Sequence, residues 1–218
     1  MRTAEDLALL LHEPDTGAPL VDSTSLPRAL AGAVVLQLVL DGRAHLADGG
    51  RWRGTRLVVD DRGRTGDHVL DLALERLPDD ASPKSAIEKL QGRVRDPLMA
   101  GLVHDGALRL EERALLGIPR SPRYPAADRT RRDAVVARLR AVLVDGAAPS
   151  RDDAALVALV RAVKAEHELL DAPRRELRDR SKVVAEGEWA GEAVRRAIAD
   201  VHAAVAAAAG AGAVAASS

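Results

Sequence analysis

The sequence predicts a mainly α-helical fold, formed by a single domain over residues 1–209 with one or two small β-hairpins. Residues 29–40 carry one polar side chain, Gln37, and segments with Leu, Ala and Val at helical spacing lie on both sides of them. Two short segments rich in turn residues interrupt the helical pattern. The chain has no Phe and one Tyr, so Leu and Val must fill the core.

The apolar segment is predicted to form a central buried helix over residues 26–41. Its twelve most apolar residues reach about 18 Å as a helix, whereas a bilayer core is about 30 Å thick. Pro27 near the start and Gly42 just after the end are typical helix boundaries. Because a helix that is apolar on every face must be covered by other elements, we expect amphipathic helices around it.

The remaining elements follow from the periodicity of the chain. Helices are predicted over residues 3–13, 65–77, 82–96, 128–145, 151–171, 173–186 and 192–209, with a further short helix that ends at Gly106 and precedes a strand. Residues 43–61 are interpreted as two short strands around Asp48-Gly49-Gly50, and residues 111–125 as a loop or hairpin tip. Residues 210–218 have low complexity, and we expect a flexible tail there.

Composition narrows the classes of function. The formal net charge of −1 argues against a globally basic nucleic-acid binder but allows a local basic face. The chain has no cysteine, which excludes disulfides and thiolate metal sites. Residue usage is typical of a GC-rich bacterial genome. The N-terminus lacks a secretory signal pattern, so we expect a cytoplasmic protein, with contact to the inner face of the membrane as one option.

No catalytic or metal-binding motif stands out. The six histidines are scattered, and we interpret them as solvated or capping residues. The serines form no GxSxG motif, and the glycines form no phosphate-binding loop. We therefore expect a non-enzymatic protein without a metal or cofactor.

Arginines are the more informative residues. One group surrounds the first hairpin (Arg43, Arg51, Arg53, Arg56, Arg62, Arg64), and another follows the second (Arg120, Arg123, Arg129, Arg131, Arg132). Guanidinium groups suit bidentate contact with phosphate. The alternative is an ordinary charged surface in a chain with many arginines.

The tip of the 111–125 segment combines apolar and basic residues. Leu115, Leu116 and Ile118 stand next to Arg113, Arg120 and Arg123. Such a loop can insert into a membrane while its arginines meet anionic head groups. It can equally contact a second subunit or fold back on its own core.

Four stretches in this order resemble the Golgi phosphoprotein 3 family. They are EDLALLLHEPDTGAPL, ALAGAVVLQLVLDGRAHL, RTGDHVLDLALERL and GLVHDGAL, within a resemblance that runs over most of residues 3–205. The resemblance implies a helical core around one apolar helix, with a projecting hairpin at about residues 108–122. Eukaryotic members bind phosphatidylinositol 4-phosphate and hold glycosyltransferases at Golgi membranes through their cytoplasmic tails.

The resemblance also implies a head-group pocket. The family's pocket tryptophan aligns with Asp22, one arginine aligns with Ala31, and an arginine pair aligns with Gly92 and Arg95. The candidate head-group residues are therefore Arg95, with Arg93 and Arg28 close in sequence to the lost positions. The candidate membrane or oligomer contacts are Leu115, Leu116, Ile118 and Arg120.

Two functions remain in view. The first is a peripheral membrane protein that binds anionic phospholipid head groups and acts as an adaptor or scaffold. The family resemblance implies phosphoinositide-like binding. Cytoplasmic tails of membrane proteins and further copies of the chain are its candidate partners. The second is a soluble homo-oligomeric interaction module without lipid binding. Residues 28–59 could suggest a winged helix, but a recognition helix needs polar residues for base edges, so we expect no nucleic acid partner.

Overall fold

The apolar segment near the start of the chain forms the central helix of the structure, a computed structural model that describes residues 3–50, 54–115, 118–186 and 192–215. Within these ranges the chain forms ten helices and two small antiparallel sheets, which confirms the predicted fold class. The helices are α1 (Thr3–Leu10), α2 (Ser25–Leu40), α4 (His68–Arg76), α5 (Pro83–Leu90), α6 (Arg95–His104), α7 (Thr130–Leu143), α8 (Arg151–Ala162), α9 (Glu166–Leu169), α10 (Arg174–Glu186) and α11 (Glu192–Ala215).

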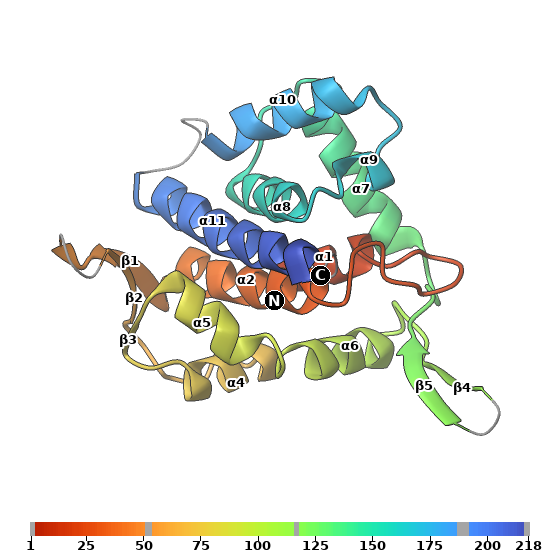
Figure 1. Ribbon diagram of the computed structural model, residues 1–218, viewed down its shortest axis with the longest axis horizontal. Helices are drawn as coiled ribbons and strands as arrows, with labels where there is room; N and C mark the ends of the chain where they lie inside the picture. The colour runs from red at the N-terminus through yellow and green to blue at the C-terminus, as the bar shows by residue number, and fades with distance from the viewer. Residues whose placement is uncertain (1–2, 51–53, 116–117, 187–191, 216–218) are drawn as a thin grey trace.

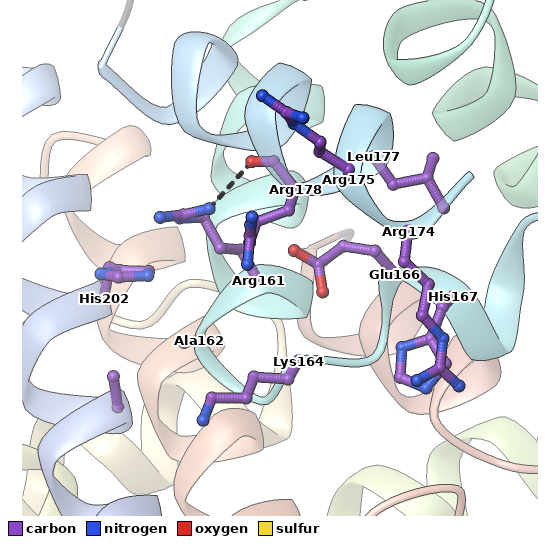
Figure 2. A pocket seen from close by; sticks show the side chains of 11 residues that line it. Arg161, Ala162, Lys164, Glu166, His167, Arg174, Arg175, Leu177, Arg178 and His202 are labelled. Carbon is purple, nitrogen blue, oxygen red and sulfur yellow. Dashed lines mark hydrogen bonds between the residues drawn. The ribbon is translucent and has the colours of Figure 1, made fainter. Parts of the chain in front are cut away.

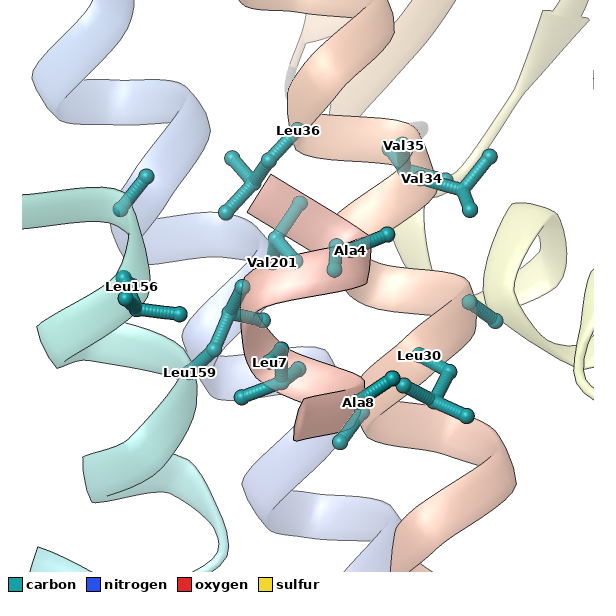
Figure 3. Packing of buried hydrophobic residues seen from close by; sticks show 14 of the residues in the cluster. Ala4, Leu7, Ala8, Leu30, Val34, Val35, Leu36, Leu156, Leu159 and Val201 are labelled. Carbon is teal, nitrogen blue, oxygen red and sulfur yellow. The ribbon is translucent and has the colours of Figure 1, made fainter. Parts of the chain in front are cut away.

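Helix α2 is buried from Ala29 to Leu38, as its composition predicts. Helices α1, α5, α8 and α11 pack around it, and α10 lies beyond α8 (Figure 1). Leu7 of α1, Leu159 of α8 and Val201 of α11 belong to the same apolar cluster as the side chains of α2 (Figure 3). The core is therefore one continuous aliphatic layer around a single helix.

The one polar side chain of the apolar segment has a structural role. Gln37 Oε1 accepts a hydrogen bond from the backbone N–H of Thr3 at 3.0 Å, and its Nε2 donates to Asp41 Oδ1 at 2.9 Å. The amide thereby satisfies one of the free N–H groups at the start of α1. Gln37 fixes where α1 begins on the surface of α2.

The first predicted hairpin is confirmed. Strands β1 (Ala44–Asp48) and β2 (Thr55–Val59) pair antiparallel, with Leu46 opposite Leu57. A third strand, β3 (Asp80–Ala81), adds to β2 and was not predicted, because two residues are too few for a periodic pattern. The arginines of this region mostly serve the fold: Arg56 Nε donates to Asp80 Oδ1 at 2.5 Å, Arg43 pairs with Asp61, and Arg62 pairs with Asp79.

The second hairpin projects from the helical body (Figure 1). Its strands are β4 (Glu111–Leu115) and β5 (Ile118–Arg123), and Leu115 pairs with Ile118 at the outer end. Of the two predicted alternatives for this segment, a loop or a hairpin, the structure shows the hairpin.

Two predicted helices are wrong in their extent. The helix expected over residues 82–96 ends at Leu90, and α6 begins at Arg95 after a turn around Gly92. Pro97 fits only the first turn of a helix, since it lacks an N–H. The helix expected over residues 151–171 ends at Ala162, and a short helix, α9, follows.

The interpretation of the histidines as solvated or capping residues is wrong for His12. Its side chain is buried, and its Nδ1 lies 2.7 Å from the carbonyl oxygen of Ala8. Burial lowers the pKa of His12 to about 4, and the nearby Arg95 and Arg123 act in the same direction. The imidazole is therefore neutral at pH 7.

At the C-terminal end, α11 extends to Ala215, which includes part of the segment predicted as a flexible tail. Among the described residues, no helix combines the length and hydrophobicity that crossing a bilayer requires.

Candidate anion-binding site

A basic hollow lies where the start of α2, the start of α6 and the second hairpin meet. Its volume is about 580 Å³. The charged residues that line it are all arginines: Arg95, Arg113, Arg120 and Arg123. Ser23, Leu26 and Pro27 form the side contributed by α2 and the loop before it. The hollow therefore concentrates positive charge against a partly apolar wall.

Arg95 is fixed at the first residue of α6. Its side chain is 24% exposed, and its Cζ lies 5.6 Å from the centroid of the Tyr124 ring. Tyr124 is buried and makes an edge contact with His12, with ring centroids 6.3 Å apart. The carboxylate nearest to Arg95 is Asp96, at 3.3 Å, and it is largely exposed. The cation–π contact orients the guanidinium without neutralising it.

The hairpin contributes the other three arginines. Arg113 and Arg120 stand directly opposite each other in the register of β4 and β5. Like charges in such a cross-strand pair destabilise a sheet. The side chains of Arg113, Arg120 and Arg123 make no hydrogen bond or ion pair within the described part of the chain, although Arg123 stands opposite Glu111 in the register. A bound anion would relieve the repulsion between Arg113 and Arg120.

The loop between α1 and α2 supports the base of the hairpin. The backbone N–H of Ala126 donates to the carbonyl oxygen of Pro14 at 2.8 Å. A Cβ at Gly17 would lie 2.3 Å from backbone atoms of Tyr124 and Pro125, and Gly17 also has a φ of +61°. Only glycine allows this contact, which holds Tyr124 in place under Arg95.

Asp22 lies in the turn three residues before the first residue of α2. Its Oδ1 accepts hydrogen bonds from the N–H groups of Thr24 and Ser25 at 2.8 and 2.9 Å, and its Oδ2 accepts one from Ser25 Oγ at 2.6 Å. The hydroxyl of Ser25 is the largest cause of a lowered pKa for Asp22. The end of α2 is thus satisfied by the chain itself. An anion in the hollow would be held by arginines rather than by free N–H groups of α2.

The candidate residues of the sequence do not form one cluster. Arg95 and Arg120, which the sequence assigns to different roles, line the same hollow. Arg93 lies in a separate hollow beside Arg76 and Lys89. Arg28 Nε donates to Gln91 Oε1 at 3.0 Å.

Arg113 and Arg123, which the sequence places beside the apolar tip as arginines that could meet anionic head groups, also line this hollow. The pairing of β4 with β5 brings them there. At the tip, Leu115 and Ile118 are paired strand residues, while Leu116 lies outside the described residues.

Comparison with protein families matches residues 4–201 to Golgi phosphoprotein 3 (GPP34). The chain belongs to this family. A search of curated proteins finds no matching relative. The matched residues include both the central helix α2 and the projecting hairpin of β4 and β5.

The resemblance implies three pocket positions at which this chain carries a different residue, namely Asp22, Ala31 and Gly92. Asp22 caps α2, Ala31 is fully buried in the core, and Gly92 is exposed in the turn before α6. Arg95 alone keeps its residue type, and the structure surrounds it with hairpin arginines. The hollow is therefore basic through a set of residues different from the aligned one.

Proposed function

We propose that this Golgi phosphoprotein 3 family member is a non-enzymatic peripheral membrane protein that binds anionic phospholipid head groups. The observation that carries the proposal is the hollow around Arg95, in which four arginines face no lining carboxylate. A volume of about 580 Å³ lies within the range of small-ligand sites, about 300–1,000 Å³. Arginine forks match phosphate geometry.

The position of the hairpin supports a membrane rather than a free ligand. The same hairpin that supplies Arg113, Arg120 and Arg123 projects from the helical body and ends at the Leu115–Ile118 pair (Figure 1). A projecting tip with apolar residues can enter the interface while the arginines behind it reach phosphates. We infer that hollow and tip contact one membrane surface together.

An adaptor or scaffold role completes the proposal. The support is family membership, and the candidate clients are cytoplasmic tails of membrane proteins. The vesicle test compares phosphatidylinositol 4-phosphate with other anionic lipids. This comparison matters because the resemblance implies three pocket positions at which this chain carries a different residue.

Sedimentation with vesicles tests head-group binding. We expect pelleting with phosphatidylcholine vesicles that contain phosphatidylserine or phosphatidylinositol 4-phosphate, and none with phosphatidylcholine alone. A basic residue near an anionic surface contributes about 1 kcal/mol, so Arg95→Gln and Arg120→Gln should each weaken binding about fivefold. Arg93→Gln is the matched control, because Arg93 is an exposed arginine outside the hollow.

Two results would contradict the proposal. One is equal pelleting with neutral and anionic vesicles. The other is an Arg93→Gln variant that loses as much binding as Arg95→Gln.

Asp22→Asn is a further variant. It keeps the side-chain oxygen that caps α2 but removes a negative charge near the hollow, so binding of anionic vesicles should strengthen about twofold to threefold.

A soluble homo-oligomeric module is the second candidate. The observation that favours it is Leu110, which follows α6 at the base of the hairpin and is 50% exposed. A second copy could cover Leu110 and the tip. Light scattering on a Leu115→Asp, Leu116→Asp variant tests this candidate: a mass that falls to the monomer supports it, and an unchanged mass means that the tip is not the interface.

A further inference from the structure

A second basic hollow lies between α8, α9, α10 and α11 (Figure 2). Its volume is about 670 Å³. The cationic residues that line it are Arg161, Lys164, Arg174, Arg175 and Arg178, and Glu166 is the one carboxylate among the lining residues. In Figure 1 these helices form the part of the molecule away from the projecting hairpin.

Glu166 is held by a neutral partner from the fold and sets one negative charge against the five cations of the hollow. It is buried, and its Oε1 accepts a hydrogen bond from Ser181 Oγ at 3.0 Å. Arg161 Nη1 donates to the carbonyl oxygen of Arg178 at 3.1 Å, as the dashed line in Figure 2 shows. These contacts tie α10 to α8 and hold Arg161 in place.

The remaining cations are weakly compensated. The side chains of Lys164 and Arg174 make no hydrogen bond or ion pair within the described ranges. Asp179 lies 3.7 Å from Arg175 and 3.9 Å from Arg178, but it is mostly exposed. Exposed pairs at such distances contribute little, so the lining of the hollow keeps an excess of positive charge.

The backbone at Lys164 points to a role for this side chain. Lys164 has a φ of +57° and is the only described residue other than glycine with a positive φ. It directly follows the C-cap residue Val163, where a glycine commonly ends a helix. Backbone strain of this kind often marks a functional position. The lysine at this position adds a cation to the hollow, although its positive φ is strained for any residue other than glycine.

The wall behind the cations is apolar. Ala162 and Leu177 are buried, and Ala206 of α11 lies beside them. His202 of α11 also lines the hollow, and burial followed by the charge of Arg161 lowers its pKa. Its ring nitrogens add hydrogen-bonding groups to the lining of the hollow.

We propose that this hollow is a second anion site, in which the phosphate of a small organic molecule binds Lys164, Arg174 and Arg178 while its apolar part contacts Leu177 and Ala206. The phosphate could belong to a free metabolite or to a lipid head group. The site is independent of the hollow around Arg95, because the two share no lining residue.

Calorimetric titration with phenyl phosphate tests the proposal. The titrated protein carries Arg95→Gln and Arg120→Gln, so that binding at the first hollow is weakened. We expect Lys164→Gln to lower the remaining affinity about tenfold, which is typical for the loss of one hydrogen bond to a charged group. Lys182→Gln, an exposed lysine of α10 outside the hollow, should leave the affinity unchanged. Inorganic phosphate should bind more weakly than phenyl phosphate, because it lacks the apolar part.

Two further measurements complete the test. Lys164→Gly removes the cation and suits the positive φ, so loss of affinity in this variant cannot result from misfolding. Phosphatidylserine vesicles that displace phenyl phosphate only when Lys164 is present would assign the phosphate to a lipid, and vesicles without effect would assign it to a free molecule. Equal affinities of the Lys164→Gln and Lys182→Gln proteins, or no binding by either, would overturn the proposal. The loss of vesicle pelleting in Arg95→Gln reports on the first hollow, whereas the affinity for phenyl phosphate in the Arg95→Gln, Arg120→Gln protein reports on the second, so failure of either proposal can be recognised separately.

Discussion

Gly32 sets how closely α11 approaches the central helix, and Gly32→Ala tests this packing. A Cβ at this position would lie 2.8 Å from Val205 Cγ2, 3.2 Å from Val201 Cγ1 and 3.4 Å from Leu159 Cδ2. Unstrained carbon–carbon contacts are about 3.5–4.0 Å, so the nearest contact would be too short by roughly 0.7 Å or more. Valine is β-branched and cannot easily rotate away.

Two opposing effects determine the expected free energy. Overpacking a core costs about 1–3 kcal/mol, whereas replacing glycine by alanine inside a helix gains about 0.5–1 kcal/mol. We therefore expect Gly32→Ala to lower the free energy of unfolding by about 1–2 kcal/mol. Val205→Ala alone should cost about 2 kcal/mol, since it removes two buried methyl groups. Together the two changes should cost less than their sum by about 1–2 kcal/mol, because the new methyl group enters the space that Val205 leaves.

Urea unfolding of the four proteins measures this coupling. Gly101→Ala is the control: Gly101 lies in α6 with no atom within 4 Å of a Cβ, so this change should stabilise the protein by about 0.5–1 kcal/mol. Strictly additive costs at Gly32 and Val205, or a Gly32→Ala protein as stable as the Gly101→Ala protein, would refute close packing of α11 on α2.

Three further predictions concern buried or strained polar groups. Asp6 is 4% exposed and pairs with Arg138 at 3.1 Å and Arg131 at 3.4 Å, so Asp6→Asn should cost about 3 kcal/mol in urea unfolding, and a cost near zero would contradict a structural role for this cluster. The pKa of His12 is about 4 when folded and 6.5 as its reference value, so the unfolded state binds more protons between these values and stability should fall as the pH drops from about 6.5 to about 4. The loss should reach about 2 kcal/mol at pH 5 and about 3 kcal/mol below pH 4, and a His12→Leu protein with the same pH dependence would exclude His12 as its source. Lys164→Gly should raise the melting temperature, because it relieves about 1 kcal/mol of left-handed strain, and a lower melting temperature would contradict that account.

The hairpin site illustrates the limits of sequence reasoning. Arg95 was found because a family motif carries it, but its neighbours in space come from β4 and β5, whose register alone brings Arg113 opposite Arg120. Arg93, two residues from Arg95, lies elsewhere because α5 ends at Leu90 and α6 starts anew at Arg95. A helix boundary thus decides which arginine enters the hollow. Local propensity places such boundaries poorly, since neighbouring elements compete for the same few residues.

The second hollow lay beyond sequence reasoning altogether. Its cations come from α8 and α10 and from the turn after α8, and each of these segments by itself has the composition of an ordinary charged surface. Lys164 became notable only through its φ, a property that no residue pattern reveals outside glycine.

The amino-acid order by itself determined the central helix and the helical class, because hydrophobic spacing and a run of apolar residues constrain burial whatever the surrounding fold. The family followed from the resemblance of four ordered stretches, which the family match supports. Only the tertiary structure decided which arginines share a hollow, why Gln37 and His12 tolerate burial, and where two long helices end. The residue pattern of one segment is enough to predict which of its faces is buried. A binding site instead depends on the distances between segments, and these distances are set by tertiary packing, which the pattern of one segment does not specify.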